Sequence, residues 1–434
     1  MAKKTINPII QALKPSGIRK YFDLASTMKG VISLGVGEPD FDTPWHISQA
    51  AVESFQKGLT HYTANRGLLS LRQEIADYYK NHYGVEYDPA KEVLVTVGGS
   101  EAVDLSFRTI LSPGDEVIVL DPNYVAYEPA ILMAGAKPVY IRLSQENDFK
   151  LLPEDLKAAL SDKTKAIMLN FPSNPTGGVM TREDYEKVVP ILEESGIYII
   201  SDEIYSELLF EGEFCTPASF PSLRDQTLII NGFSKAYAMT GWRLGYLLAP
   251  RELSAQLTKV HQFIIMSAPT AGQYAAIEAL RTGDEDCERM KKEYERRRNL
   301  LCSRLNAMGL KTNVPKGTFY AFPNITSSGL TSDEFCMQLL ESQKIAIVPG
   351  TAFGDSGEGF VRISYATSMA NIKEACDRIE IFLNECKEKQ AAQAVARNLI
   401  SEVAQDYEAS ARVKEFVQEL AIVEEALAEG LQFK

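Results

Sequence analysis

The stretch that decides the fold reads Thr227-Leu-Ile-Ile-Asn-Gly-Phe-Ser-Lys-Ala-Tyr-Ala-Met-Thr-Gly-Trp-Arg-Leu-Gly-Tyr-Leu-Leu248. It begins with an apolar, β-branched run, Thr227–Asn231, and closes with a second apolar run, Leu244–Leu248. Short apolar runs bounded by glycine and small polar residues are typical of buried strands. Between the two runs lies a turn of mostly small residues that holds Lys235 and Arg243. The stretch therefore predicts a strand, a polar turn and a second strand.

Similar apolar runs recur upstream, and most are followed by a tight turn or a helix-like stretch. These expected strands are Val93–Val97, Glu116–Leu120, Pro138–Ile141, Ala166–Leu169 and Tyr198–Ser201. Strands that alternate with helices predict an α/β fold with a mainly parallel sheet covered on both faces. In such sheets the ligand binds beyond the carboxyl ends of the strands. Functional residues are therefore expected directly after the apolar runs.

The last third of the chain predicts a second, smaller unit and a helical tail. A charged helix is expected at Asp284–Met308, followed by strands at Gly317–Phe322, Ile345–Val348 and Phe360–Ser364 and by helices at Ser332–Ser342 and Met369–Cys386. Beyond Lys389 apolar residues recur at three- and four-residue steps, namely Val413, Phe416, Leu420, Val423, Leu427 and Leu431. Such a stripe predicts a helix that packs on this protein, with another subunit or a separate partner as alternatives.

Composition excludes several classes of protein. The chain has 434 residues, so we expect two substantial domains. Its formal net charge is -13, so we expect no binding to nucleic acid or to an anionic membrane surface. The six cysteines form no C-x-x-C pair and the four histidines form no ligand-spaced cluster, which favours reduced thiols and no metal site. The N-terminus has no secretory pattern and no apolar run reaches roughly 20 residues, so a cytoplasmic location is expected.

The turn between the last two strands carries the strongest chemical signal, because Arg243 follows Lys235 by eight positions. The whole stretch resembles the signature of the class I and II aminotransferases, which are pyridoxal-phosphate enzymes of fold type I. The resemblance implies that Lys235 holds the cofactor as a Schiff base and that Arg243 binds its phosphate. A desolvated lysine is available as the amine near neutral pH, and an arginine fork satisfies phosphate oxygens. Ser234 can add a hydroxyl, although the family more often uses the position that Gly232 occupies here.

A second motif, Asn170-Phe-Pro-Ser-Asn-Pro-Thr-Gly-Gly178, follows the strand expected at Ala166–Leu169. Taken alone it is an ordinary turn. By resemblance, Asn174 donates a hydrogen bond to the phenolic oxygen of the cofactor and also lies beside the substrate.

A third motif, Tyr198-Ile-Ile-Ser-Asp-Glu-Ile-Tyr205, ends a buried strand in an aspartate. A buried carboxylate is costly unless its charge is used, and the alternative role is a helix N-cap. By resemblance, Asp202 pairs with the pyridine nitrogen of the cofactor and Tyr205 bonds the phenolic oxygen beside Asn174. Glu203 is expected to be an exposed carboxylate in the first turn of a helix.

The segment Val95-Thr-Val-Gly-Gly-Ser-Glu-Ala102 predicts a strand, a glycine turn and a helix start. Bare N–H groups at a helix N-terminus can bind phosphate. Gly99, Ser100 and Glu101 match the family's phosphate loop, in which mostly main-chain amides bind the phosphate.

Two aromatic positions extend the resemblance. Tyr124, in Asp121-Pro-Asn-Tyr-Val-Ala-Tyr127, matches the aromatic that stacks on the pyridine ring, although a core aromatic is the alternative. Tyr62 resembles the tyrosine that reaches the phosphate of the neighbouring subunit. The resemblance therefore implies a homodimer with shared active sites.

Two further segments resemble the parts of the family that bind substrate. Gly359-Phe-Val-Arg-Ile-Ser-Tyr365 carries Arg362 at the place of the arginine that clamps the substrate α-carboxylate. The alternative is a surface arginine in an ion pair. Ser33-Leu-Gly-Val-Gly-Glu-Pro-Asp-Phe41 resembles the segment that closes over the substrate, where Gly37 offers its backbone to the carboxylate.

The resemblance covers roughly residues 18–389 and is closest to bacterial aspartate, aromatic and N-acetyl-diaminopimelate aminotransferases. It implies a large pyridoxal-phosphate-binding domain at 49–295 with a mainly parallel seven-stranded sheet, and a smaller α+β domain at 296–389. Residues 1–48 form an N-terminal arm and part of the small domain, and 390–434 a helical extension. The implied reaction moves the α-amino group of an aspartate-type or aromatic donor to a 2-oxo acid of the 2-oxoglutarate type.

Two other functions are compatible with the same motifs. The scaffold also supports β-elimination by a carbon–sulfur lyase, and a non-catalytic regulator could use the domain to sense the cofactor. The regulator normally needs a basic DNA-binding module, which this sequence does not show. Side-chain specificity stays open, because only Arg66 and Lys316 are candidates for binding a distal substrate carboxylate.

Overall fold

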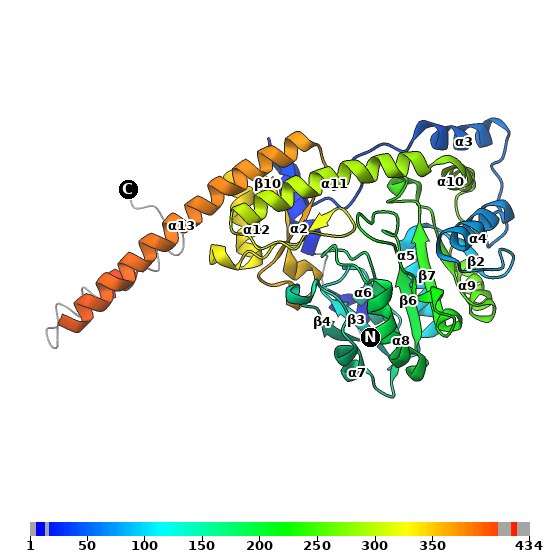
Figure 1. Cartoon of the computed structure of the whole chain (residues 1–434), viewed down its shortest axis with the longest axis horizontal. Helices are drawn as coiled ribbons and strands as arrows, with labels where there is room; N and C mark the ends of the chain where they lie inside the picture. Colours follow the sequence, from blue (N-terminus) through cyan, green and yellow to red (C-terminus); the bar gives the residue numbers. More distant parts are fainter. Residues whose placement is uncertain (1–5, 14–16, 407–417, 423–434) are drawn as a thin grey trace, which may run out of the picture.

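The computed structural model describes residues 6–13, 17–406 and 418–422. Seven strands form one sheet in the order β2-β8-β7-β6-β5-β3-β4 (Figure 1). In chain order they are β2 (Val93–Thr96), β3 (Glu116–Asp121), β4 (Lys137–Arg142), β5 (Thr164–Asn170), β6 (Tyr198–Asp202), β7 (Thr227–Gly232) and β8 (Gly245–Leu248). Neighbouring strands from β4 to β7 are parallel, and β8 runs antiparallel to both of its neighbours. The predicted mainly parallel sheet is confirmed, and so are its seven strands.

Helices cover both faces of this sheet. On one face lie α5 (Gly98–Ile110), α6 (Tyr127–Met133) and α9 (Arg251–Ile264), which share a core with Val117 and Val119 of β3. On the other face lie α7 (Pro153–Ala159) and α8 (Arg182–Ser195), which share a core with Ile118 and Leu120. The far end of the sheet is covered by three more helices, α3 (Trp45–Gln56), α4 (Leu69–Tyr83) and α10 (Thr270–Thr282). Successive residues of a strand point to opposite faces, so a strand buried on both faces must be apolar throughout.

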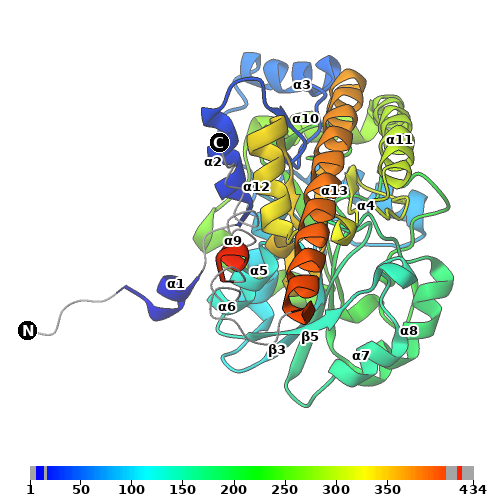
Figure 2. The same ribbon diagram turned by 90° about the vertical axis from the view of Figure 1, so that its left-hand side faces the viewer.

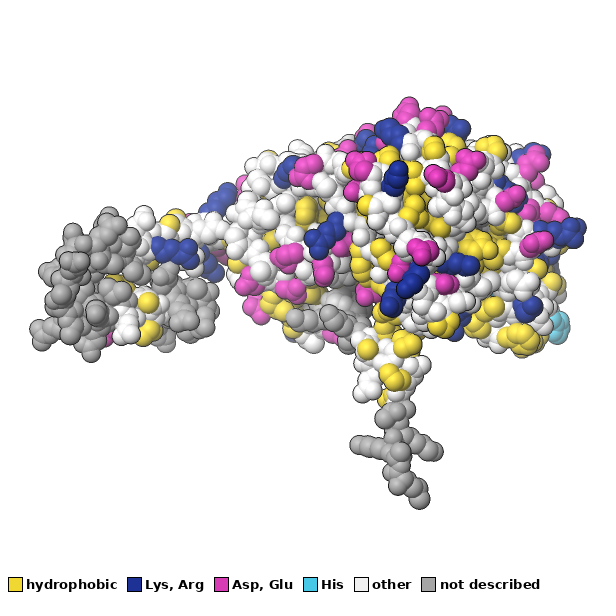
Figure 3. Space-filling model, turned by 90° about the horizontal axis from the view of Figure 1, so that it is seen from below, with side chains coloured by type: hydrophobic (Ala, Val, Ile, Leu, Met, Phe, Trp, Pro, Cys, Tyr) yellow, Lys and Arg dark blue, Asp and Glu magenta, His cyan; other side chains and the backbone are white. Residues whose placement is uncertain are grey.

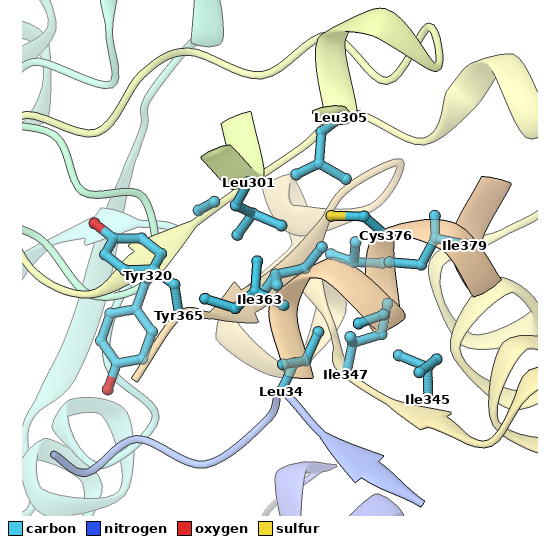
Figure 4. Packing of buried hydrophobic residues seen from close by; sticks show 14 of the residues in the cluster. Leu34, Leu301, Leu305, Tyr320, Ile345, Ile347, Ile363, Tyr365, Cys376 and Ile379 are labelled. Carbon is cyan, nitrogen blue, oxygen red and sulfur yellow. The ribbon is translucent and has the colours of Figure 1, made fainter. Parts of the chain in front are cut away.

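The second unit is built around two small sheets. β9 (Tyr320–Ala321), β12 (Val361–Ser364) and β11 (Val348–Pro349) are antiparallel, and β1 (Ile32–Ser33) runs parallel to β10 (Ile345–Ala346). Around them lie α2 (Gly17–Thr27), α11 (Asp284–Ala307), α12 (Ser332–Gln343) and the first half of α13 (Met369–Asp406). Figure 4 shows how Leu34, Leu301, Ile363 and Ile379 meet in their common core. The pairing of β1 with β10 places this N-terminal segment within the second unit.

Burial along α13 is confined to its first half among the side chains that the structure describes. The first part of the helix lies beside α11 and α12 (Figure 2), and its buried side chains run from Ile372 to Cys386. Between residues 387 and 399 every side chain is exposed or half-buried, and the helix projects away from the body (Figure 1). The predicted helix at Met369–Cys386 and the start of the predicted extension are therefore one continuous helix. Of the predicted apolar stripe, Leu420 lies half-buried in a short helical stretch, and the other five residues lie outside the described residues.

All six cysteines are buried and none is in a disulfide, as the sequence predicted. Among the described helices, none has the length and apolar character needed to cross a lipid bilayer.

Candidate active site

A cavity of about 830 Å³ opens where β5, β6 and β7 end. Asn170 and Asp202, the last residues of β5 and β6, lie side by side in the sheet and both line it. The N-terminus of α5 forms another wall, and Tyr320 and Arg362 close the cavity from the second unit. The cavity therefore lies at the carboxyl ends of parallel strands, as predicted.

Lys235 projects into this cavity from the turn after β7. Its Nζ donates a hydrogen bond to the carbonyl oxygen of Gly37 at 2.5 Å. It lies 5.7 Å from the ring centre of Tyr205. Burial, together with the nearby positive charge of Arg362, lowers the pKa of Lys235 from 10.5 to about 8, against the opposing effect of Glu38 and Asp202. With this pKa roughly a tenth of the amine is neutral at pH 7, and the neutral fraction grows as the pH rises toward 8.

Asp202 lies across the cavity from Lys235, at the end of β6. Its carboxylate accepts hydrogen bonds from the Tyr127 hydroxyl at 2.7 Å and from the backbone N–H of Ile204 at 3.2 Å. Burial raises the pKa of Asp202 to about 6, and these two bonds hold it down. The residues after Asp202 form turns and no α-helix, so Asp202 is not a helix N-cap. It is a buried anion whose negative charge faces the cavity.

The opposite end of the cavity is suited to an anion. The first turn of α5 presents Gly99 and Ser100 to it, and N–H groups of a first turn have no partner within the helix. Arg243 stands beside them with φ 53°, which lies in the left-handed region. Gly98 has φ 73°, in the same left-handed region, and a Cβ atom there would come 2.6 Å from Nη2 of Arg243, so glycine is favoured at this turn. Ser234 also lines the cavity.

Arg362 is almost fully buried at the wall formed by the second unit. Its Nη1 donates to Oδ1 of Asn174 at 2.9 Å, and its Nη2 donates to the carbonyl oxygen of Gly35 at 2.7 Å. Its Nε is buried without a hydrogen-bond partner. Burial lowers the pKa of Arg362, and no carboxylate balances its charge among its hydrogen-bond partners in the described chain. The surface ion pair that the sequence left open is therefore not what Arg362 forms.

Tyr205 and Tyr320 meet at the same wall. Their hydroxyl oxygens are 3.0 Å apart, and both side chains are buried. The Tyr320 hydroxyl would be 2.6 Å from a Cβ atom at Gly37, so glycine is needed there too. Tyr124 lines the cavity and meets the Tyr127 ring edge-on, with the ring centres 5.5 Å apart.

Two residues of the predicted cofactor site do not reach the cavity. The Glu101 side chain turns back to accept a hydrogen bond from the Val97 N–H and to contact Nδ1 of the buried His261 at 2.7 Å. Tyr62 is 82% exposed on the surface of this chain. Neither candidate for a distal carboxylate, Arg66 or Lys316, lines the cavity.

Glu203 departs from what the sequence predicts, because its side chain is completely buried and not exposed. The chain turns after Asp202 without forming a helix, so Glu203 points into the core on the α4 side of the sheet. Sequence reasoning also missed two tyrosines of the site. Tyr127 begins α6 three residues after Tyr124 and belongs to the same sequence motif, so it could have been found there, whereas Tyr320 comes from a distant strand and leaves no local signal.

The side chains in this cavity fit pyridoxal phosphate. The anion site at α5 and Arg243 suits its phosphate. The amine of Lys235 suits its aldehyde, and the buried acid Asp202 suits its basic ring nitrogen. Apart from Glu101 and Tyr62, all the predicted site residues line one cavity: Gly37, Gly99, Ser100, Tyr124, Asn174, Asp202, Tyr205, Ser234, Lys235, Arg243 and Arg362.

Comparison with known proteins gives one consistent result. The family model for aminotransferase class I and II matches residues 29–379. The protein YugH of Bacillus subtilis is 47% identical over 380 residues, which are 88% of this chain and 98% of YugH. An aspartate aminotransferase of Pyrococcus abyssi is 45% identical, covering 87% of this chain and 98% of its own length. The crystal structure of an aromatic aminotransferase from Pyrococcus horikoshii has a TM-score of 0.81 and 43% identity, covering 85% of this chain and 99% of its own. These matches confirm the resemblance and the fold predicted from the sequence.

Proposed function

Because the chain belongs to the class I and II aminotransferase family and is a pyridoxal-phosphate-dependent transaminase, we propose that aspartate or an aromatic amino acid is its donor. The acceptor is a 2-oxo acid of the 2-oxoglutarate type. Relatives named for aspartate and for aromatic amino acids support this choice of donor. The family match favours transamination over the carbon–sulfur lyase and over the non-catalytic regulator.

The cofactor is held at three places. Arg243, Ser234 and the first turn of α5 bind its phosphate, where Glu101 acts through its main chain. Asp202 holds the ring nitrogen protonated, with Tyr124 against the ring and Asn174 and Tyr205 at the phenolic oxygen. When bound, pyridoxal phosphate withdraws electrons from the Cα of the amino acid and so makes its C–H bond acidic.

Lys235 is the base in this proposal. Its pKa of about 8 leaves a usable fraction of neutral amine at Nζ near neutral pH. The neutral Nζ takes the proton from Cα of the bound amino acid and then carries it as an ammonium group. The hydrogen bond from Nζ to the carbonyl oxygen of Gly37 holds the amine at the cavity wall.

The observation that carries the proposal is the buried guanidinium of Arg362. It is held in place by Asn174 and Gly35, faces the cavity that holds Lys235, and has an unpartnered Nε. A carboxylate is the ligand that suits such a group, and two-point binding would orient Cα toward Nζ. Asn174 therefore touches both the cofactor and the arginine that binds substrate.

The enzyme works as a homodimer in this proposal, in the cytoplasm. Large apolar side chains are exposed at α3 and at the end of α9, including Trp45, Phe55 and Phe263. The N-terminal segment around α1 (Pro8–Ala12) stands out from the body with apolar side chains on its surface (Figure 3). Exposed apolar surface of this extent is typical of subunit interfaces. Within such a dimer Tyr62 would reach the phosphate of the neighbouring subunit.

A half-reaction screen tests the proposed donor. Each amino acid is added alone to the enzyme loaded with pyridoxal phosphate, and the visible absorbance is followed. Aspartate or an aromatic amino acid should bleach the band, and a 2-oxo acid should restore it. If no amino acid bleaches the band while cystine yields pyruvate without an acceptor, transamination is the wrong reaction.

A further inference from the structure

Glu203 is a buried acid that the mechanism above does not use. It follows Asp202 directly, yet its side chain lies on the far side of the sheet from the cavity and is fully buried. Its Oε1 accepts hydrogen bonds from the hydroxyls of Ser201 at 2.9 Å and Thr216 at 2.6 Å, and its Oε2 accepts one from Tyr79 at 3.0 Å. Three donors converging on one carboxyl suit the ionised form, which only accepts. A fully buried and fully bonded carboxylate is costly to build unless its charge is used.

Tyr79 links this carboxylate to the turn that carries Lys235. The Tyr79 hydroxyl accepts a hydrogen bond from Nδ2 of Asn231 at 3.1 Å, so its own proton is directed to Glu203. Asn231 lies near the end of β7, four residues before Lys235, and its Nδ2 also donates to the Ser206 hydroxyl at 3.2 Å. The network therefore joins the end of β6, the helix α4 and the end of β7.

The charge of Glu203 is coupled to that of Asp202. Burial raises the pKa of Glu203 to about 7, its three hydrogen bonds lower it, and the negative charge of Asp202 raises it. Coupling between two charges is reciprocal, so an ionised Glu203 also adds negative potential at Asp202. The other groups that respond to this charge are kept neutral by burial, which raises the pKa of each: the thiol of Cys215 and the hydroxyls of Tyr79 and Tyr83 of α4, Tyr87, Tyr185 of α8 and Tyr246 of β8.

We propose that Glu203 is a positioning residue that places a second negative charge behind Asp202 and, through Tyr79 and Asn231, holds the end of β6 against the turn of Lys235. This inference rests on the proposed role of Asp202 at the ring nitrogen. Its consequence is that the positively charged, protonated form of the bound cofactor is stabilised by two carboxylates and not by one.

The test compares three variants of the full-length protein loaded with pyridoxal phosphate. Glu203→Gln keeps the size and removes the charge, whereas Tyr79→Phe keeps the carboxyl group, removes one of its three donors and breaks the link to Asn231. Glu207→Gln is the matched control, because Glu207 is an acid of the same loop that bonds Tyr78 and Tyr83 but not this network. The measured quantity is the pH midpoint of the visible absorbance of the bound cofactor.

Removing a negative charge destabilises a cation, so Glu203→Gln should lower the midpoint by roughly half a unit to one unit. Tyr79→Phe removes one of the three donors to Glu203, so it should lower the midpoint by less than Glu203→Gln does, and it should also speed release of the cofactor several-fold. Glu207→Gln should change neither quantity. A midpoint that Glu203→Gln leaves unchanged overturns the proposal, and so does an equal shift in Glu207→Gln. If Glu203→Gln does not fold, Thr216→Val replaces it. Loss of that donor favours the protonated acid, so the midpoint should fall in the same direction, and an unchanged midpoint again refutes the idea.

A measurement without cofactor separates this inference from the proposed function. The folded pKa of Glu203 lies above the ordinary value of 4.5, so its protonated form is favoured by folding. The free energy of unfolding of the apoprotein should therefore fall as pH rises from about 5 to 7, and Glu203→Gln should reduce that fall. A protein that bound no pyridoxal phosphate would contradict the proposed function, while this comparison would still decide whether Glu203 is a charged, buried acid.

Discussion

At Lys235, burial and the charge of Arg362 act in the same direction, and both make the amine easier to deprotonate. The amine is neutral above its pKa, which is lowered from 10.5 to about 8. The rate at which the apoprotein takes up pyridoxal phosphate should therefore rise with pH and level off above about 8. Stopped-flow absorbance across the pH range measures this directly. A rate that still climbs beyond pH 10 would show that Lys235 behaves as an ordinary exposed lysine.

Arg362 makes a second prediction at the scale of the residue. Arg362→Lys keeps the charge but loses the planar fork, so kcat/KM for the amino donor should fall by about 10²- to 10³-fold. Arg304→Lys, on the exposed face of α11 beside Asp377, is the matched control and should stay within about twofold. Steady-state kinetics with both variants checks this. A fall of less than about threefold in Arg362→Lys would place substrate binding elsewhere.

One physical reason explains why the positions of some side chains could not be predicted from the sequence. Asp202 ends β6, and Lys235 and Asn174 follow the ends of β7 and β5 within a few residues, so their place at the sheet edge follows from the apolar pattern. Glu203 also follows a strand, but the direction of its side chain depends on Tyr79 of α4 and on Thr216, which are distant in sequence. Such tertiary contacts leave no trace in the local pattern, and the same holds for Tyr320.

Among the elements, α5 depends on a contact that fixes its first turn. Glu101 bonds the Val97 N–H before the helix and contacts His261 of α9, so it holds the turn that presents Gly99. Glu101→Ala should weaken the binding of pyridoxal phosphate by about tenfold, because it costs about one charged hydrogen bond. Titration of the apoprotein with the cofactor measures this dissociation constant. Ser106→Ala, which removes a hydroxyl inside the same helix, is the control, and an equal loss there would mean that α5 was merely destabilised.

The strands were predictable because they are buried on both faces. β3 reads Glu-Val-Ile-Val-Leu-Asp, and its alternate residues enter two different cores. A continuous apolar run of this length is typical of a strand that is buried on both faces, so the sequence predicts β3 well. α13 was harder to bound, because burial ends at Cys386 while the helix continues to Asp406. The spacing of apolar residues identifies the buried face of a helix, but it does not show where the core on which the helix packs comes to an end.

For the whole molecule, we predict a dimer with twice the mass of 48.1 kDa and an active site that needs two chains. In a homodimer of Lys235→Ala chains both active sites lack the lysine, and in a homodimer of Tyr62→Ala chains both lack the tyrosine. If Tyr62 serves the neighbouring subunit, a mixed dimer has one intact site, and random mixing should restore about a quarter of the wild-type activity. Light scattering gives the mass, and assays after mixing give the activity. Activity equal to the average of the two parents would assign Tyr62 to its own chain.

Truncation tests where the folded body ends. A chain that stops after Gln390 keeps every side chain of α13 that is buried among those the structure describes, so its kcat should match that of the full chain within error, and its melting temperature reports whether the predicted stripe of the tail packs on this protein. A chain that stops after Glu380 is the control, because it loses Phe382 and Leu383 from the core, at a cost of about 2–5 kcal/mol each. Calorimetry compares the two. A lower melting temperature after the first truncation would mean that the later residues pack on the body.

The exposed half of α13 can also serve as a molecular ruler. An α-helix rises 1.5 Å per residue, so position 399 stands roughly 20 Å beyond the last core contact at Cys386. Because all six native cysteines are buried, a Leu399→Cys substitution would offer a thiol-reactive dye a single accessible anchor. A donor and an acceptor dye on the two chains of an assembled pair would report the separation of the two helices by energy transfer, far from the chemistry.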